Sequence, residues 1–322
     1  PQILEELERY GVTAERKSIY ADFEDMTEKL GIEIIKEKIP IPASIGRICP
    51  HPCEANCRRK FVEEPLSIAY LKAFAADNDL SSNEPFVPEK AKPTGKKVSV
   101  IGGGPAGLTA AYYLCLSGHE VTVFDSMPEM GGMLRYGIPE YRLPKDVLKK
   151  EISAIENLGV LMKNNVSIGK NISFEEIRKK SDAVLISTGA WKAYGIGCPG
   201  EELSGVISGI NFLREVNCGN IPEIGKNVAV VGGGNTAMDA CRTAIRCGAE
   251  NVYVIYRRTR AEAPAEDIEI EEAIEEGVTF RFLTNPAEII GENGKVLALD
   301  LGKIEVDAAG TSRFVLRGKG LL

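Results

Sequence analysis

The segment Val98–Asp125, VSVIGGGPAGLTAAYYLCLSGHEVTVFD, constrains the fold of this chain more than any other. An apolar run that predicts a buried strand leads into three glycines at G-x-G-x-x-G, a helix-forming stretch and a second apolar run. In such a unit the first glycine allows a tight turn, the second lets the backbone approach a pyrophosphate, and the third lets helix and strand pack closely. The helix start attracts phosphate, and a terminal carboxylate can bind a ribose. The segment predicts a dinucleotide site at Gly102, Gly104, Gly107 and Asp125.

A second copy of this pattern begins at Val228, with the sequence VAVVGGGNTAMDACRTAIRCGAENVYVIYRR. It places Gly232, Gly234 and Ala237 at G-x-G-x-x-A, and a further glycine follows 16 residues after the first one, as in the first copy. Two matched strand–helix–strand units in one chain predict two nucleotide sites.

The two copies differ at the end of the second strand. Where the first copy has Asp125, the second has Tyr256, followed directly by Arg257 and Arg258. A carboxylate at this point would repel a ribose 2′-phosphate, whereas a guanidinium binds it through charge-assisted hydrogen bonds. We therefore expect the second site to prefer NADP(H). The alternative is a pair of solvated arginines at a strand end.

Three cysteines, Cys49, Cys53 and Cys57, stand at C-x3-C-x3-C within GRICPHPCEANC. Thiolates favour an iron–sulfur cluster or zinc, and they can converge if the segment coils into a turn or helix. His51 is a candidate fourth zinc ligand, although it lies closer to the cysteines than is usual. The alternative is a set of small buried hydrophobic residues. Eight cysteines without a secretory signal favour a reducing compartment, and we expect a cytoplasmic location.

The remaining pattern alternates helices and strands, which predicts an α/β fold. We expect helices at 3–9, 15–30, 33–38, 145–158, 174–180 and 266–276, strands at 160–168, 183–187 and 278–283, and a hairpin around 292–294. The polar stretch 77–97 reads as a linker. The expected domains are a helical domain with linker at 1–90, a first Rossmann-like domain at 96–195 and a second at 196–322.

Composition excludes several classes of function. The net charge is −7 and no strongly basic block is present, so a nucleic-acid surface is not expected. No segment reads as membrane-spanning. The absence of C-x2-C or C-x4-C beside either glycine loop argues against a disulfide reductase. With two histidines in the chain, no Ser–His–Asp site is legible.

Taken together, five motifs resemble the glutamate synthase small subunit and its relatives, namely the flavin half of dihydropyrimidine dehydrogenase and the large subunit of electron-bifurcating ferredoxin:NADP transhydrogenase. They are GRICPHPCEANC, the first glycine fingerprint, GGMLRYGIPEYRLP, VVGGGNTAMDACRTA and YRR-x-x-x-E-A-P-A. The resemblance implies a helical iron–sulfur domain followed by an FAD domain and an NADPH domain, each Rossmann-like. It implies electron transfer between NADPH, FAD and a 4Fe-4S cluster, to or from a redox partner subunit or ferredoxin.

The resemblance also assigns residues to each cofactor. FAD would contact the first glycine loop, including Pro105 and Ala106, together with Asp125, Gly132, Met133, Arg142 and Ile168. NADPH would contact the second loop and the strand end, at Gly232, Gly233, Gly234, Asn235, Thr236, Ala237, Arg257 and Arg258. The cysteines at 49, 53 and 57 would be cluster ligands.

The chain departs from the family pattern in three respects. No cysteine precedes Cys49, whereas the family has an upstream cysteine run. The chain ends near the point where the family returns to the FAD domain, and Ala263 stands where relatives commonly have methionine. We therefore expect part of a longer polypeptide, or a subunit completed by another chain. The alternative to a redox subunit is a structural or assembly subunit that keeps the fold without flavin.

Overall fold

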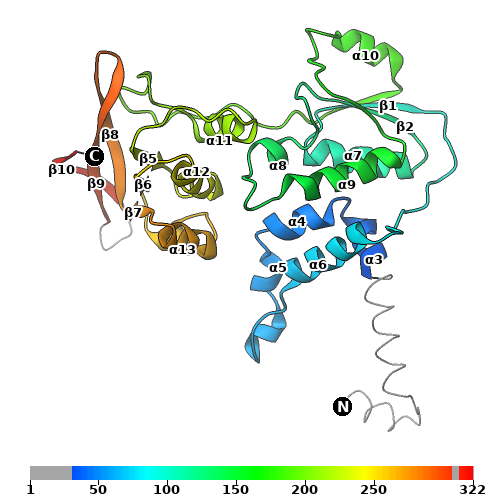
Figure 1. The fold of residues 1–322 in the computed structure, drawn as a ribbon, viewed down its shortest axis with the longest axis horizontal. Helices are drawn as coiled ribbons and strands as arrows, with labels where there is room; N and C mark the ends of the chain where they lie inside the picture. Colours follow the sequence, from blue (N-terminus) through cyan, green and yellow to red (C-terminus); the bar gives the residue numbers. More distant parts are fainter. Residues whose placement is uncertain (1–30, 307–311, 322) are drawn as a thin grey trace. The chain divides into compact units, whose positions relative to one another are not determined.

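The computed structural model describes residues 31–306 and 312–321, and the chain divides into two compact units (Figure 1). Unit 1 runs to Leu134 and continues from Arg142 to Thr188. Unit 2 contains the short segment Arg135–Tyr141 and the chain from Gly189 onward. The chain therefore passes between the units three times. The helices expected at 3–9 and 15–30 lie outside the described residues.

Unit 1 begins with a helical part. Its elements are α3 (Gly31–Lys38), α4 (Pro42–Ile48), α5 (Pro52–Ala55), the 3-10 turn η2 (Arg58–Phe61) and α6 (Ile68–Ser81). Helices α4 and α6 touch so closely that a Cβ atom on Gly46 would lie 2.6 Å from the Ala73 Cβ. The helix expected at 33–38 is confirmed as part of α3.

The predicted start of the linker at residue 77 is wrong, because helix α6 continues to Ser81. Two carboxylates of this last turn bind cations on neighbouring helices. Asp77 forms a bidentate pair with Arg47, at 2.8 and 3.0 Å, and Asp79 pairs with the buried Lys36. Because both aspartates are paired with cations, they can lie in a packed helix, and their polar character does not indicate a linker.

The rest of unit 1 is a parallel sheet flanked by helices. Its elements are β1 (Lys97–Ile101), α7 (Pro105–Leu116), β2 (Glu120–Phe124), α8 (Met133–Tyr136), α9 (Lys145–Asn157), β3 (Leu161–Lys163), α10 (Phe174–Lys180) and β4 (Ala183–Ile186). The strand order is β3-β2-β1-β4, with β1 between β2 and β4. The strand expected at 160–168 has only three residues, because Asn165 adopts a positive φ of 58° soon after it.

Unit 2 contains a second parallel sheet, with order β5-β6-β7, and a separate antiparallel sheet, with order β10-β9-β8. Its elements are α11 (Gly209–Asn217), β5 (Asn227–Val231), α12 (Asn235–Arg246), β6 (Asn251–Ile255), the 3-10 turn η3 (Arg260–Glu262), α13 (Asp267–Glu275), β7 (Thr279–Arg281), β8 (Thr284–Glu292), β9 (Lys295–Val306) and β10 (Ser312–Leu321). The expected hairpin is confirmed, with Asn293 and Gly294 both at positive φ between β8 and β9.

A buried carboxylate joins the helical part of unit 1 to its sheet part. Glu151 of α9 is 3% exposed, and its two oxygens accept the backbone N–H groups of Ala43 and Ser44 at 2.6 and 2.9 Å. These groups belong to the first turn of α4, where N–H groups have no partner within the helix. Burial raises the pKa of the Glu151 carboxyl.

We predict that Glu151→Ala lowers the free energy of unfolding by about 1–3 kcal/mol, because two buried N–H groups lose their acceptor. Urea denaturation followed by circular dichroism measures the change. Glu156→Ala, on the exposed side of α9, is the matched control and should have little effect. Equal stability of the two variants would contradict this role.

Candidate functional site: two glycine loops and a cysteine segment

The first glycine loop connects β1 to α7 through contacts that exclude side chains. Gly102 has φ 108°, and its N–H donates to the carbonyl of Phe124 at 2.8 Å. A Cβ atom on Gly107 would lie 1.9 Å from the carbonyl oxygen of Gly102, so helix and loop fit only around a glycine. No side chain caps the start of α7 at Gly104. The first-turn N–H groups therefore lack a side-chain acceptor, which suits phosphate binding.

Asp125 follows β2 and is joined to the loop. Its Oδ2 accepts the Gly103 N–H at 2.6 Å, and its Oδ1 accepts the Met127 N–H at 2.8 Å. The side chain is partly exposed, so the carboxylate also faces solvent. An oxygen can accept more than one hydrogen bond, so a ribose hydroxyl has room to bind here.

The segment after Asp125 returns to the same loop. The Gly131 N–H donates to the Gly103 carbonyl at 2.8 Å, and a Cβ atom on Gly132 would lie 2.7 Å from the Gly104 Cα. The structure therefore brings Gly132, and Met133 next to it, to the first glycine loop. Ile168, which is also predicted to contact FAD, is half-buried and packs against an apolar cluster that includes Ile101, Phe124 and Ile177. Arg142 is half-buried where the chain re-enters unit 1.

The second loop repeats the first one in its backbone. The N–H of Gly232 donates to the carbonyl of Ile255 at 3.0 Å, as Gly102 does to the strand beside it. A Cβ atom on Gly234 would meet no other atom within 4 Å, so the space above the loop is open. Asn235 and Thr236 are exposed at the start of α12. This helix start, like that of α7, has no side-chain cap.

The side chains at the end of β6 differ from the first site. Tyr256 stands where the first site has Asp125, and its ring lies against Gly233. Arg257 and Arg258 are both exposed, and neither guanidinium makes a hydrogen bond or ion pair within the described part of the chain. Two cations without a bonded partner among these residues therefore stand beside the second loop. After the hydrogen bonds from Thr259, the charge of Arg258 also lowers the pKa of the Glu262 carboxyl.

The three cysteines lie around the short helix α5. Cys53 is exposed, and Cys49 and Cys57 are half-buried. Among residues 31–306 and 312–321, no three histidine, cysteine or acidic side chains are gathered closely enough to hold a metal ion. The thiols therefore suit a cluster by their chemistry, but they do not form a complete site by themselves. Backbone N–H groups, of Leu66 first and of Arg59, lower the pKa of the Cys57 thiol.

A family model for the pyridine nucleotide-disulphide oxidoreductases matches residues 96–311, which is most of the chain. The chain belongs to this family. A second model, described as dihydropyrimidine dehydrogenase domain II with a 4Fe-4S cluster, matches residues 20–84. These matches confirm the expected α/β fold with an N-terminal iron–sulfur domain, and the expected cofactors, FAD, NADP(H) and a 4Fe-4S cluster.

The resemblance to the glutamate synthase small subunit is also confirmed. The chain is 37% identical over 268 residues to the glutamate synthase [NADPH] small chain of Azospirillum brasilense, covering 78% of this chain and 55% of the relative. It is 42% identical over 299 residues to the NADP(+)-dependent formate dehydrogenase subunit beta of Moorella thermoacetica, covering 85% and 42%. The chain thus spans about half the length of these relatives.

The fold has solved counterparts. FprA of Mycobacterium tuberculosis, solved in complex with NADPH, superposes with a TM-score of 0.60 at 20% identity, over 70% of this chain and 68% of FprA. This similarity concerns the fold. None of the helices in the described residues is long and apolar enough to cross a membrane.

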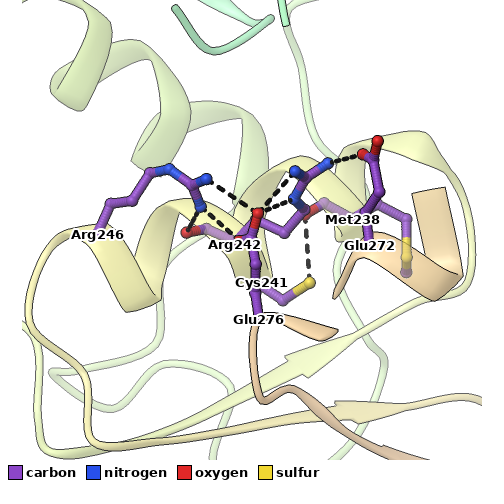
Figure 2. A network of polar contacts seen from close by, with 6 residues as sticks. All are labelled: Met238, Cys241, Arg242, Arg246, Glu272 and Glu276. Atoms are coloured by element: carbon purple, nitrogen blue, oxygen red, sulfur yellow. Dashed lines mark hydrogen bonds and ion pairs between the residues drawn. The ribbon is translucent and has the colours of Figure 1, made fainter. Parts of the chain in front are cut away.

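Helix α12, which starts at the second glycine loop, also carries a polar network that no sequence motif predicts (Figure 2). Arg242 donates to Glu272 at 2.5 Å and to Glu276 at 2.7 Å, and Arg246 donates to Glu276 at 2.5 Å. Both guanidinium groups also lie over the Tyr141 ring, 4.7 and 4.0 Å from its centre. The network fixes the far end of α12 to α13 and to the segment Arg135–Tyr141.

Tyr141 carries no functional signal of its own in the sequence. It lies in GGMLRYGIPEYRLP, but nothing in that motif says which residue faces which helix. Burial raises the pKa of the Tyr141 hydroxyl, and Arg242 favours its ionised form. The ring itself is the contact that matters, because a guanidinium over an aromatic face is held by cation–π attraction.

We predict a pH dependence of stability from Glu276, whose pKa is lowered to about 2 by hydrogen bonds from Arg246 and then Arg242. A lowered pKa means that the ionised carboxylate stabilises the fold above its unfolded value near 4.5, and that this contribution is lost as pH falls towards 2. Glu276→Gln should lower the free energy of unfolding at pH 7 by on the order of 3 kcal/mol. Urea unfolding at several pH values should show this gap shrinking on acidification. A gap that stays constant, or one matched by the exposed Glu275→Gln, would argue against it.

We predict that Asp125→Ala lowers the flavin content of the purified protein while NADP(H) binding persists, because the two glycine loops belong to different sheets. Loss of hydrogen bonds to a charged group should weaken flavin binding roughly tenfold or more. Absorbance after desalting measures the bound flavin. Asp146→Ala, an exposed change in α9, serves as the control. Parallel loss of NADP(H) binding would count against separate sites.

Proposed function

We propose that this chain is the NADPH-reacting flavin part of an iron–sulfur oxidoreductase that exchanges electrons with a redox partner subunit or ferredoxin. The observation that carries the proposal is the chemical difference between two matched loops. The first loop ends beside a carboxylate, Asp125, and the second ends beside two unpaired guanidinium groups, Arg257 and Arg258. The pair suits one nucleotide without a 2′-phosphate and one that carries it.

At the first site, the chain's residues would hold FAD. The N-terminus of α7 would bind the pyrophosphate and Asp125 would accept the ribose hydroxyls, while Gly132 keeps the segment after β2 close to the loop. Met133 and Arg142 are assigned to the flavin on the resemblance. When bound, FAD accepts a hydride from NADPH and can release the electrons singly. No acid–base residue of the chain is required for that transfer.

At the second site, Gly232–Ala237 would receive the pyrophosphate of NADP(H), since the start of α12 is exposed and uncapped. Arg257 and Arg258 would bind the 2′-phosphate. The names of the two relatives, an NADP(+)-dependent formate dehydrogenase subunit and an NADPH glutamate synthase chain, support this preference.

The proposal of a partner rests on the helical part of unit 1. A set of large apolar side chains is exposed near the cysteine segment, namely Phe61, Val62, Tyr70, Leu71 and Phe74. Phe61 and Val62 are 80% and 88% exposed, and exposed apolar patches of this kind mark protein interfaces. We infer that the redox partner covers this surface and supplies what the cysteines lack. The eight free cysteines support a cytoplasmic location.

The function is tested by nucleotide preference in the flavin-loaded protein. Arg257→Ala with Arg258→Ala should remove most of the preference for NADPH over NADH, because charge-assisted hydrogen bonds to phosphate are worth roughly 1.5–3 kcal/mol each. The rate of anaerobic flavin reduction by each nucleotide gives the preference. Lys226→Ala removes an exposed cation of the same unit and should leave the preference intact.

Two outcomes would refute the proposal. A purified protein without flavin absorbance, even with its partner, would favour a structural or assembly subunit. Equal discrimination between the nucleotides before and after the double change would show that the arginines do not read the 2′-phosphate.

A further inference from the structure

The loop that carries Arg257 and Arg258 is fixed by its backbone at both ends. On the strand side, the Leu283 N–H donates to the Arg258 carbonyl at 3.1 Å. On the far side, the Ala265 N–H donates to the Gly233 carbonyl at 3.1 Å. The loop therefore leaves β6 and returns to the middle of the second glycine turn.

Tyr256 ties the interior of this loop to the glycine turn. Its ring packs on Gly233, where an added Cβ atom would lie 2.6 Å from the ring carbons. Its hydroxyl donates to the carbonyl of Glu262 at 2.9 Å. Tyr256 is only 9% exposed, and this hydrogen bond is partly buried.

Glu262 connects this hydrogen bond to the arginines, because its side chain binds Thr259. Its Oε2 accepts the Thr259 backbone N–H at 3.1 Å and the Thr259 hydroxyl at 2.8 Å, which closes the turn η3. Thr259 directly follows Arg258. The Tyr256 hydroxyl thus holds the Glu262 backbone, and the Glu262 carboxylate holds Thr259. Together these contacts fix the backbone that carries the two guanidinium groups.

The contrast between backbone and side chains is informative. The backbone around Arg257 and Arg258 is held by the contacts above, whereas the two guanidinium groups have no bonded partner among the described residues. A fixed backbone beneath free charges is the arrangement that lowers the entropic cost of binding an anion. Two arginines that only face solvent would gain no binding energy from a fixed backbone.

We propose that Tyr256 is a positioning residue for selection of the 2′-phosphate, acting through Glu262 and without touching the phosphate; this rests on the proposed NADP(H) site. In the first unit the same position is held by Asp125, which binds the Gly103 N–H with a carboxylate. In the second unit an uncharged ring takes that place. Tyr256 therefore secures the loop without a charge of its own at this position. The anion of the loop is Glu262, whose pKa is lowered by hydrogen bonds from Thr259 and further by the charge of Arg258.

The experiment measures dissociation constants for NADP⁺, NAD⁺ and adenosine 2′,5′-bisphosphate by calorimetry on the flavin-loaded protein, so that no turnover is needed. Tyr256→Phe keeps the ring and removes the hydroxyl. It should weaken NADP⁺ and the bisphosphate about three- to tenfold, the value of one hydrogen bond, and leave NAD⁺ nearly unchanged. Glu262→Ala should act in the same direction, whereas Glu262→Gln retains an acceptor for Thr259 and should restore much of the binding.

Tyr253→Phe is the matched control, since it removes a hydroxyl from within β6, before the loop that begins at Tyr256. If the arginine double variant abolishes the NADP⁺ preference but Tyr256→Phe and Glu262→Ala do not reduce it, the inference is overturned while the proposed function stands. If the wild-type protein shows no preference for NADP⁺, both fall. Equal weakening of NADP⁺ and NAD⁺ would mean that Tyr256 only supports the fold.

Discussion

The architecture depends on how closely a helix can approach the strand before it. In unit 1 a Cβ atom on Gly107 would lie only 1.9 Å from the carbonyl oxygen of Gly102, so any side chain there would push α7 away from the end of β1. Only this close approach places the N-terminus of α7 beside Asp125 and Gly132. In unit 2 the helix and the loop are packed less closely. A Cβ atom added to Gly232 would lie 3.4 Å from the Cβ of Ala237, which is the residue at the position of Gly107. Both nucleotide loops therefore exist because small residues stand at the helix start.

The two loops show how one backbone design can hold different chemistry. In each, a glycine N–H binds the neighbouring strand, and the residue after that strand reaches back to the next glycine. The difference lies in what reaches back, which is a carboxylate in one unit and a phenol ring in the other. Under the proposed assignment, the charge at this single position would determine whether a phosphate group is tolerated nearby.

Much of this could be predicted from the sequence, because glycine spacing and apolar strands are local signals. The β8–β9 hairpin and helix α10 likewise follow from short-range patterns. Asp77 and Asp79 were misleading because their partners lie 30 and 43 residues away. Tyr141 was missed for the same reason, since its partners Arg242 and Arg246 come a hundred residues later. The full ligand set of the cysteine site could not be predicted. The spacing of the cysteines indicates which residues are candidate ligands, but it does not show whether their side chains come together in space.

Unit 2 is discontinuous in the sequence, because the segment Arg135–Tyr141 belongs to it and is separated from the rest by residues of unit 1. A recombination event that moved only the codons from Gly189 onward into another flavoprotein would leave Arg242 and Arg246 without the Tyr141 ring over which both guanidinium groups lie. It would also leave Asn217 without the Tyr136 carbonyl to which it donates. The two units are thus expected to be inherited together, and any engineered chimera must transplant this seven-residue segment along with the second unit.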